Sequence, residues 1–145
     1  MLQGLLLLFC ADICSLELFP EGKLFKRPIP GTPQNVSKND TRVKNAILTG
    51  TYSFNNESND AFLFKASAVE DAKRQIVNGI RYILDVEISR TVCRKMQNTN
   101  DLNNCAFQTD GPLRQTFFCH FDIWSIPWMK KMMTEHFNCR SFDKL

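Results

Sequence analysis

The sequence has few of the features that mark an enzyme, a metalloprotein or a nucleic-acid-binding protein. Its only two histidines, His120 and His136, have no serine or carboxylate arrangement beside them that would make a catalytic triad. The net charge is only +3, and lysines and arginines are scattered among acidic residues. The cysteines lack the close C-x2-C spacing of structural zinc sites. We therefore expect no catalytic residue, metal, cofactor or nucleic-acid partner.

Long hydrophobic runs are also missing, apart from residues 5–11 near the N-terminus. That run is too short to span a bilayer but has the length of a secretory signal core, although no basic residue precedes it. We expect a signal peptide at 1–15, an irregular N-terminal trunk at 16–38 and a folded domain at 39–145. A buried terminal segment is the alternative reading of the apolar run.

Four cysteines in the C-terminal half form an even set that allows three disulfide pairings. Nearest-neighbour pairing, Cys93 with Cys105 and Cys119 with Cys139, closes two short loops and fits strands joined by hairpins. Three N-glycosylation sequons begin at Asn35, Asn39 and Asn56. Together these features favour a secreted or endolysosomal protein.

The strongest local signal is a hairpin turn at Asn78-Gly79, because this dipeptide tolerates the positive φ angles that tight turns require. Both flanking segments, 62–74 and 80–92, are predicted to be strands. The residues expected on one face of these strands are Phe62, Phe64, Ala66, Ala68, Ile80, Tyr82, Leu84, Val86 and Ile88.

One helix is predicted at 40–54, where apolar residues recur at steps of three and four. Asp40 suits the N-cap, the polar cluster 55–60 should end the helix, and Gly50 would let it approach a sheet closely. Further strands are expected at 113–126 and 129–138, where the two histidines could be cross-strand neighbours. The plan is α+β, with one helix packed across an antiparallel sheet of four or five strands.

Three surface segments have the character of binding elements: the trunk at Gly31, the turn Gln75-Ile76-Val77-Asn78-Gly79, and Pro127-Trp128. Tryptophan is a preferred binding anchor, and an exposed one is costly unless a partner covers it. In this order, and with the spacings C-x11-C and C-x19-C, the sequence resembles a type 2 cystatin from about Gly31 to Cys139.

The resemblance implies a reversible inhibitor of papain-like cysteine proteases such as cathepsins. In that family the trunk, the Q-x-V-x-G hairpin and the Pro-Trp hairpin form a wedge that fills the protease active-site cleft, and the cysteines pair as nearest neighbours. In some members an asparagine in the loop after the helix is bait for legumain, an asparaginyl endopeptidase. Ser58-Asn59-Asp60 matches that pattern, with an ordinary polar turn as the alternative.

A non-inhibitory member of the same fold, acting as a binding or self-assembling module, is the alternative function. Edge strands and hairpin tips can mediate domain swapping. Cys14, if it survives signal cleavage, would be unpaired and could link two chains. A monomer, a domain-swapped dimer and a disulfide-linked dimer therefore all stay open.

Overall fold

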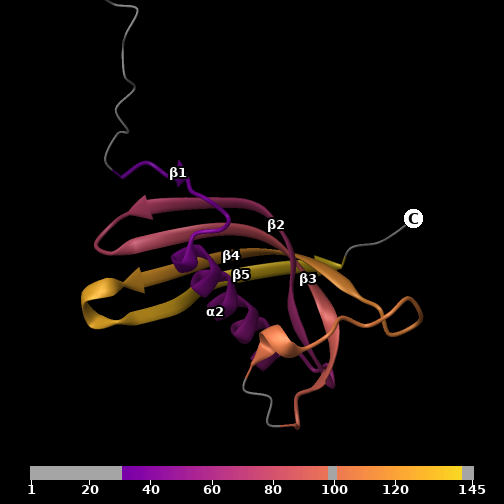
Figure 1. Ribbon diagram of the computed structural model, residues 1–145. Helices are drawn as coiled ribbons and strands as arrows, with labels where there is room; N and C mark the ends of the chain where they lie inside the picture. The colour runs from indigo at the N-terminus through magenta and orange to yellow at the C-terminus, as the bar shows by residue number, and fades with distance from the viewer. Residues whose placement is uncertain (1–30, 98–100, 142–145) are drawn as a thin grey trace, which may run out of the picture.

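The structure, a computed structural model, describes residues 31–97 and 101–141 and consists of one helix across a five-stranded antiparallel sheet (Figure 1). The expected α+β fold is therefore confirmed. The predicted signal peptide and Cys14 lie outside the described residues. The elements in chain order are β1 (Gln34–Asn35), α2 (Thr41–Glu57), β2 (Phe62–Ile76), β3 (Ile80–Arg94), a 3-10 helix η3 (Leu102–Asn104), β4 (Thr116–Ile126), a 3-10 helix η4 (Pro127–Met129) and β5 (Lys131–Ser141).

Helix α2 begins where the sequence predicts and ends three residues later than expected. Its N-cap Asp40 accepts a hydrogen bond from the Arg42 amide at 2.8 Å. At the other end the buried Asn55 side chain accepts from the Phe64 amide and donates to the Phe64 carbonyl, both at 2.9 Å. Because these bonds satisfy buried backbone groups of β2, the polar residue Asn55 lies inside the helix and joins it to the sheet.

The strands follow one another in the order β1-β2-β3-β4-β5, so each pairs with its neighbour along the chain. The short strand β1 was not predicted, and its Gln34 faces Arg74 in an antiparallel pair with β2. The pair begins directly after Pro33, because proline has no amide proton to donate to the ladder. The last part of the trunk is thus attached to the sheet.

The predicted alternation is correct along β3, where Tyr82, Leu84, Val86 and Ile88 are buried. It is wrong at Ala68 in β2. Register shifts on either side of Ala68 and Val69 change which residues face the core, so that Val69 lies opposite Val86, whereas Ala68 lies opposite Glu87. Such bulges leave no mark in the hydrophobic pattern, so the sequence prediction could not place them.

Close approach of the helix to the sheet occurs at Gly50, as predicted. A Cβ atom at this position would lie 2.7 Å from the Phe121 ring of β4, which is too close for any side chain. The ring is itself fully buried in the core. Among the described residues, no helix is both long and apolar enough to cross a membrane.

Replacement of Asn55 tests the connection between helix and sheet. We expect Asn55→Ala to lower the free energy of unfolding by about 2–4 kcal/mol, because it leaves the amide and carbonyl of Phe64 buried without these partners. The gain in helix propensity is smaller, below about 0.7 kcal/mol. Urea unfolding measures the change, with the exposed neighbour Asn56→Ala as control. Equal midpoints for the two variants would contradict the assignment.

Candidate functional site

The three segments singled out in the sequence lie at one end of the sheet. In a sheet whose neighbouring strands are antiparallel and consecutive, alternate connections share an end, so the β2–β3 and β4–β5 turns lie together, at the left of Figure 1. Strand pairing brings the turns into register, since Ile80 lies opposite Ser125 just before Pro127. The trunk joins them because the Gln75 Nε2 donates to the Gly31 carbonyl at 2.6 Å.

The β2–β3 turn has a backbone that only certain residues tolerate. Asn78 and Gly79 have φ angles of 49° and 126°, and the Val77 amide donates to the Gly79 carbonyl at 3.0 Å. A Cβ atom at Gly79 would lie 2.7 Å from the Ser125 carbonyl oxygen and 2.8 Å from the Trp124 Nε1. Glycine is therefore required both by conformation and by the close packing of this turn on β4.

Large apolar side chains project from this end into solvent. The exposed fractions are 66% for Ile76, 48% for Val77, 71% for Trp128 and 51% for Met129. These residues come from both turns, and we call them the apolar edge. Pro127 starts the 3-10 helix η4, and Lys130 ends it in the left-handed conformation. Apolar groups gathered at a turn-built edge are typical of a surface that a partner covers.

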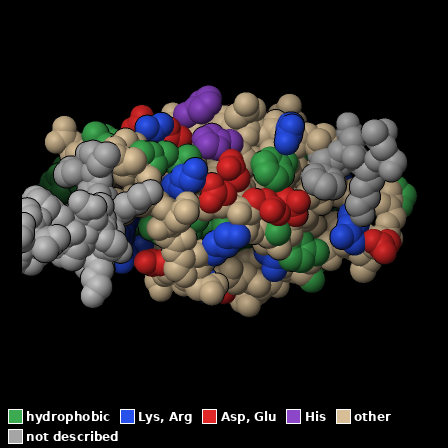
Figure 2. All heavy atoms as spheres, turned by 90° about the horizontal axis from the view of Figure 1, so that it is seen from above, with side chains coloured by type: hydrophobic (Ala, Val, Ile, Leu, Met, Phe, Trp, Pro, Cys, Tyr) green, Lys and Arg blue, Asp and Glu red, His purple; other side chains and the backbone are tan. Residues whose placement is uncertain are grey.

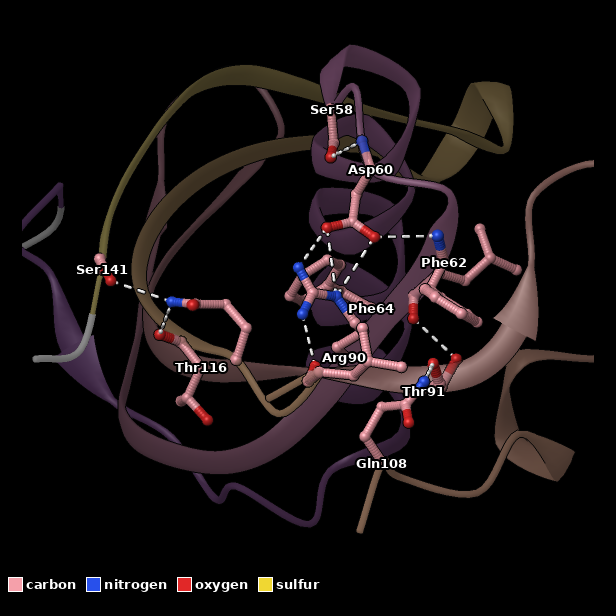
Figure 3. Close-up of polar contacts among 12 residues, drawn as sticks. Ser58, Asp60, Phe62, Phe64, Arg90, Thr91, Gln108, Thr116 and Ser141 are labelled. Atoms are coloured by element: carbon pink, nitrogen blue, oxygen red, sulfur yellow. Dashed lines mark hydrogen bonds and ion pairs between the residues drawn. The ribbon is translucent and has the colours of Figure 1, made fainter. Parts of the chain in front are cut away.

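The loop after the helix lies at the other end of the sheet, where β2 begins. Asn59 is exposed, while its neighbours are held in place. The Ser58 Oγ accepts from the Asp60 amide at 3.0 Å, and the Arg90 guanidinium points at the Asp60 carboxylate (Figure 3). The Lys95 Nζ also donates to the Ser58 carbonyl. One exposed asparagine is thus presented on a fixed loop.

The pKa of the Asp60 carboxyl group is lowered by its hydrogen-bond partners. Burial alone would raise the pKa of Asp60, but hydrogen bonds from Arg90 and from the Phe62 amide outweigh it, so the pKa lies below its ordinary value. The Arg90 Nε lies 3.2 Å from both carboxylate oxygens. The loop that carries Asn59 is therefore held by a charge-assisted contact that acid weakens.

Two disulfides and three sequons complete the candidate positions. Cys93 is bonded to Cys105, with their Cα atoms 5.7 Å apart, and Cys119 is bonded to Cys139, which lies directly opposite on β5. The first disulfide joins the end of β3 to the residue after η3. The sequon asparagines Asn35, Asn39 and Asn56 are all exposed.

The two histidines are diagonal neighbours across β4 and β5, as expected. His136 lies opposite Asp122, and His120 lies opposite Asn138, so they are not directly paired across the strands. His120 does have a carboxylate partner, since its Nδ1 lies 2.7 Å from the Asp85 Oδ1. This pair was missed because cross-strand register cannot be read from sequence spacing. In Figure 2 acidic and basic side chains are interspersed, and neither sign dominates the face shown.

Metal-binding groups are sparse in the part of the chain that the structure describes. No cluster of three or more histidine, cysteine or acidic residues there could hold a metal ion. The features that stand out are therefore a turn-built apolar edge, a presented asparagine and two disulfides, all on a one-helix, five-stranded antiparallel framework. This combination agrees with the cystatin resemblance noted in the sequence.

Comparison with known proteins agrees with the geometry. The family model described as "Cystatin domain" matches residues 31–128. The chain is 38% identical to human cystatin-F over 141 residues, covering 94% of this chain and 97% of the relative. It is 41% identical to mouse cystatin-F over 118 residues, covering 81% of this chain and 77% of the relative.

A solved structure gives the same result for the fold. The chain matches the crystal structure of dimeric human cystatin F with a TM-score of 0.75 and 38% identity, covering 86% of this chain and 98% of that chain. The chain belongs to the cystatin family. The inhibitors of this family are not enzymes, and the chain is accordingly not an enzyme.

The Asp60 contact predicts a pH-dependent stability. Because the folded pKa lies below the unfolded value of about 3.9, the stabilisation is complete above that value and is lost as the pH falls through the folded pKa. We expect Asp60→Asn to lower the free energy of unfolding by about 1–3 kcal/mol at neutral pH, and this difference from the parent should shrink as the pH falls below about 3.9.

Urea unfolding at several pH values measures this difference. Asp110→Asn is the matched control, since the Asp110 side chain is 92% exposed and its ion pair with Arg114 is on the surface. A loss of stability in Asp60→Asn that is the same at pH 3 and pH 7 would show that the carboxylate charge is not the cause.

Proposed function

We propose that the protein is a reversible inhibitor of papain-like cysteine proteases of the cathepsin type. The inhibitory surface comprises Gly31, the turn 75–79 and Pro127-Trp128. The single observation that carries this proposal is the meeting of these three segments at one end of the sheet, with the large side chains of the apolar edge exposed there. Membership of the cystatin family supports the same conclusion.

The geometry of the edge suits a blocking role. Gly79 has no side chain to collide with β4, so the turn packs tightly on that strand and presents Ile76 and Val77, while Trp128 supplies exposed apolar area beside them. A cleft filled by turn tips is closed to substrate, yet no peptide bond need lie in line with the protease nucleophile. The turns are fixed by strand pairing and by close packing on β4, so little conformational entropy is lost on binding.

The same proposal includes the compartment in which the inhibitor works. Disulfides form and persist in oxidising compartments, and this chain has two of them. The exposed sequons at Asn35, Asn39 and Asn56 are accessible to glycosylation there. We propose that the protein is secreted and also reaches the endolysosomal compartment, where cathepsins act. We further propose that residues 1–15 are its signal peptide.

Legumain is the second proposed target, through Ser58-Asn59-Asp60. An asparaginyl endopeptidase needs an exposed asparagine, and Asn59 is exposed on a loop held by Arg90 and Lys95. A rigid loop favours inhibition over cleavage, because a bound segment that cannot relax is a poor substrate. Since this loop and the apolar edge lie at opposite ends of β2, one molecule could bind both proteases.

A non-inhibitory, self-assembling module stays the alternative. Strand β5 is at the edge of the described sheet, where a second copy could pair with it. The related human cystatin F is dimeric in its crystal structure. Titration of papain or a cathepsin with the refolded, signal-free protein separates the two functions, because a module without inhibitory activity leaves protease turnover unchanged.

Two substitutions test the apolar edge. We expect Gly79→Glu to weaken papain inhibition more than about a hundredfold, because the new side chain collides with Ser125 and blocks the turn. Trp128→Ala should weaken it about thirtyfold or more, the usual loss at a binding hot spot. Progress curves of papain activity give the inhibition constants.

Matched controls separate these effects from general damage. Gly111→Glu places the same side chain at another glycine of positive φ with open space around it, and Tyr52→Ala removes an exposed aromatic from the helix. Both should keep parent-like inhibition. If Gly79→Glu inhibits as well as Gly111→Glu, the turn is not part of the inhibitory surface.

The legumain surface has an independent test. We expect Asn59→Lys to abolish legumain inhibition and to leave papain inhibition within about twofold, since the two surfaces lie at opposite ends of the sheet. Asn103→Lys, an exposed position in η3, is the control. Undiminished legumain inhibition by Asn59→Lys would remove Asn59 as the contact.

A further inference from the structure

A chain of polar contacts connects the trunk to the interior of the sheet. It runs from the Gly31 carbonyl through Gln75 at the end of β2 and Arg81 at the start of β3 to Asp122 in β4. No two of these four residues are adjacent in sequence, so the contacts depend on strand register. The family motif contains Gln75, but neither Arg81 nor Asp122 belongs to it.

Asp122 is the fixed end of this series of polar contacts. Its side chain is 12% exposed, and the Arg81 guanidinium grips both carboxylate oxygens, with the Nε 2.7 Å from the Oδ1 and the Nη2 in contact with the Oδ2. A planar guanidinium held at two points has a fixed orientation, so its remaining nitrogen points in a fixed direction. That nitrogen, the Nη1, donates to the Gln75 Oε1 at 3.3 Å.

The contact with Arg81 determines which way the Gln75 amide faces. A guanidinium only donates hydrogen bonds, so Arg81 must meet the oxygen of the amide, and the amide NH2 then faces the other side. There the Nε2 donates to the Gly31 carbonyl at 2.6 Å, and a carbonyl only accepts. Each group along the chain therefore has a partner of the correct polarity.

We propose that Arg81 and Asp122 are positioning residues that hold the trunk at Gly31 against the β2–β3 turn through Gln75, so that both segments meet a protease in one rigid arrangement. The inference rests on the proposed inhibitory function, which it deepens by naming residues behind the contact surface. On the C-terminal side of Gly31, the next described contacts of the trunk with the sheet begin at Gln34. They are the β1 pairing with β2 and the hydrogen bond from the Val36 amide to the Ala72 carbonyl. The bond to Gln75 thus holds the first residue of the trunk that the structure describes.

The Thr32 amide reports this contact directly, because it belongs to the same planar peptide group as the Gly31 carbonyl. We expect Arg81→Met and Asp122→Asn to lower the 15N heteronuclear NOE of Thr32, while that of Asn35 stays unchanged. Arg140→Met removes an equal charge at the other end of the β4–β5 pair and should leave both signals unchanged. Amide spectra of each variant establish that it is folded.

The inhibition constant for papain tests whether these contacts matter for function. We expect Arg81→Met to raise the inhibition constant about fivefold, the loss typical of one hydrogen bond. In a Gln75→Ala background the same change should add nothing, because Arg81 acts through Gln75. Additive effects would mean that Arg81 contacts the protease itself, and an unchanged Thr32 signal in both variants would also overturn the inference. If the parent protein fails to inhibit papain, the proposed function falls, but the Thr32 signal still decides whether the chain of contacts positions the trunk.

Discussion

The antiparallel register of consecutive strands is the constraint on which the rest of the structure depends. Because each strand pairs with the next along the chain, alternate connections must share an end of the sheet. The β2–β3 and β4–β5 turns therefore meet, and β1, which runs against β2, brings Gly31 to the same end. A slip of one residue between β3 and β4 would reverse the facing of every side chain and separate Gly79 from Ser125.

A second consequence of the same topology is that the remaining connections gather at the opposite end. The loop with Asn59 follows the helix there, fixed by Asn55 inside the helix and by the Arg90 contact with Asp60. A single stiff sheet thus separates two candidate binding surfaces. The helix lies close to that sheet because Gly50 has no side chain, so its backbone packs directly on the Phe121 ring. Neither surface has to move for the other to be occupied.

The Asn78-Gly79 dipeptide predicted the first hairpin, and hydrophobic periodicity predicted the helix and the two strands of that hairpin, because buried faces repeat at fixed intervals. It missed β1, whose two residues are too few to show a period, and it misplaced Ala68, because bulges change the phase without changing composition. The motif residues were found by resemblance, while Arg81, Asp122 and the contact of His120 with Asp85 were not. Those contacts come from cross-strand register, which only a three-dimensional arrangement supplies.

Hydrogen–deuterium exchange of the full protein, alone and with papain in excess, tests the central claim most directly. If Gly31, the 75–79 turn and the Pro127-Trp128 turn form one binding surface, papain will slow exchange in all three segments and leave the loop at Asn59 unchanged. Protection confined to one segment, or found on the helix or at the Asn59 loop instead, would contradict a surface built from these three converging segments.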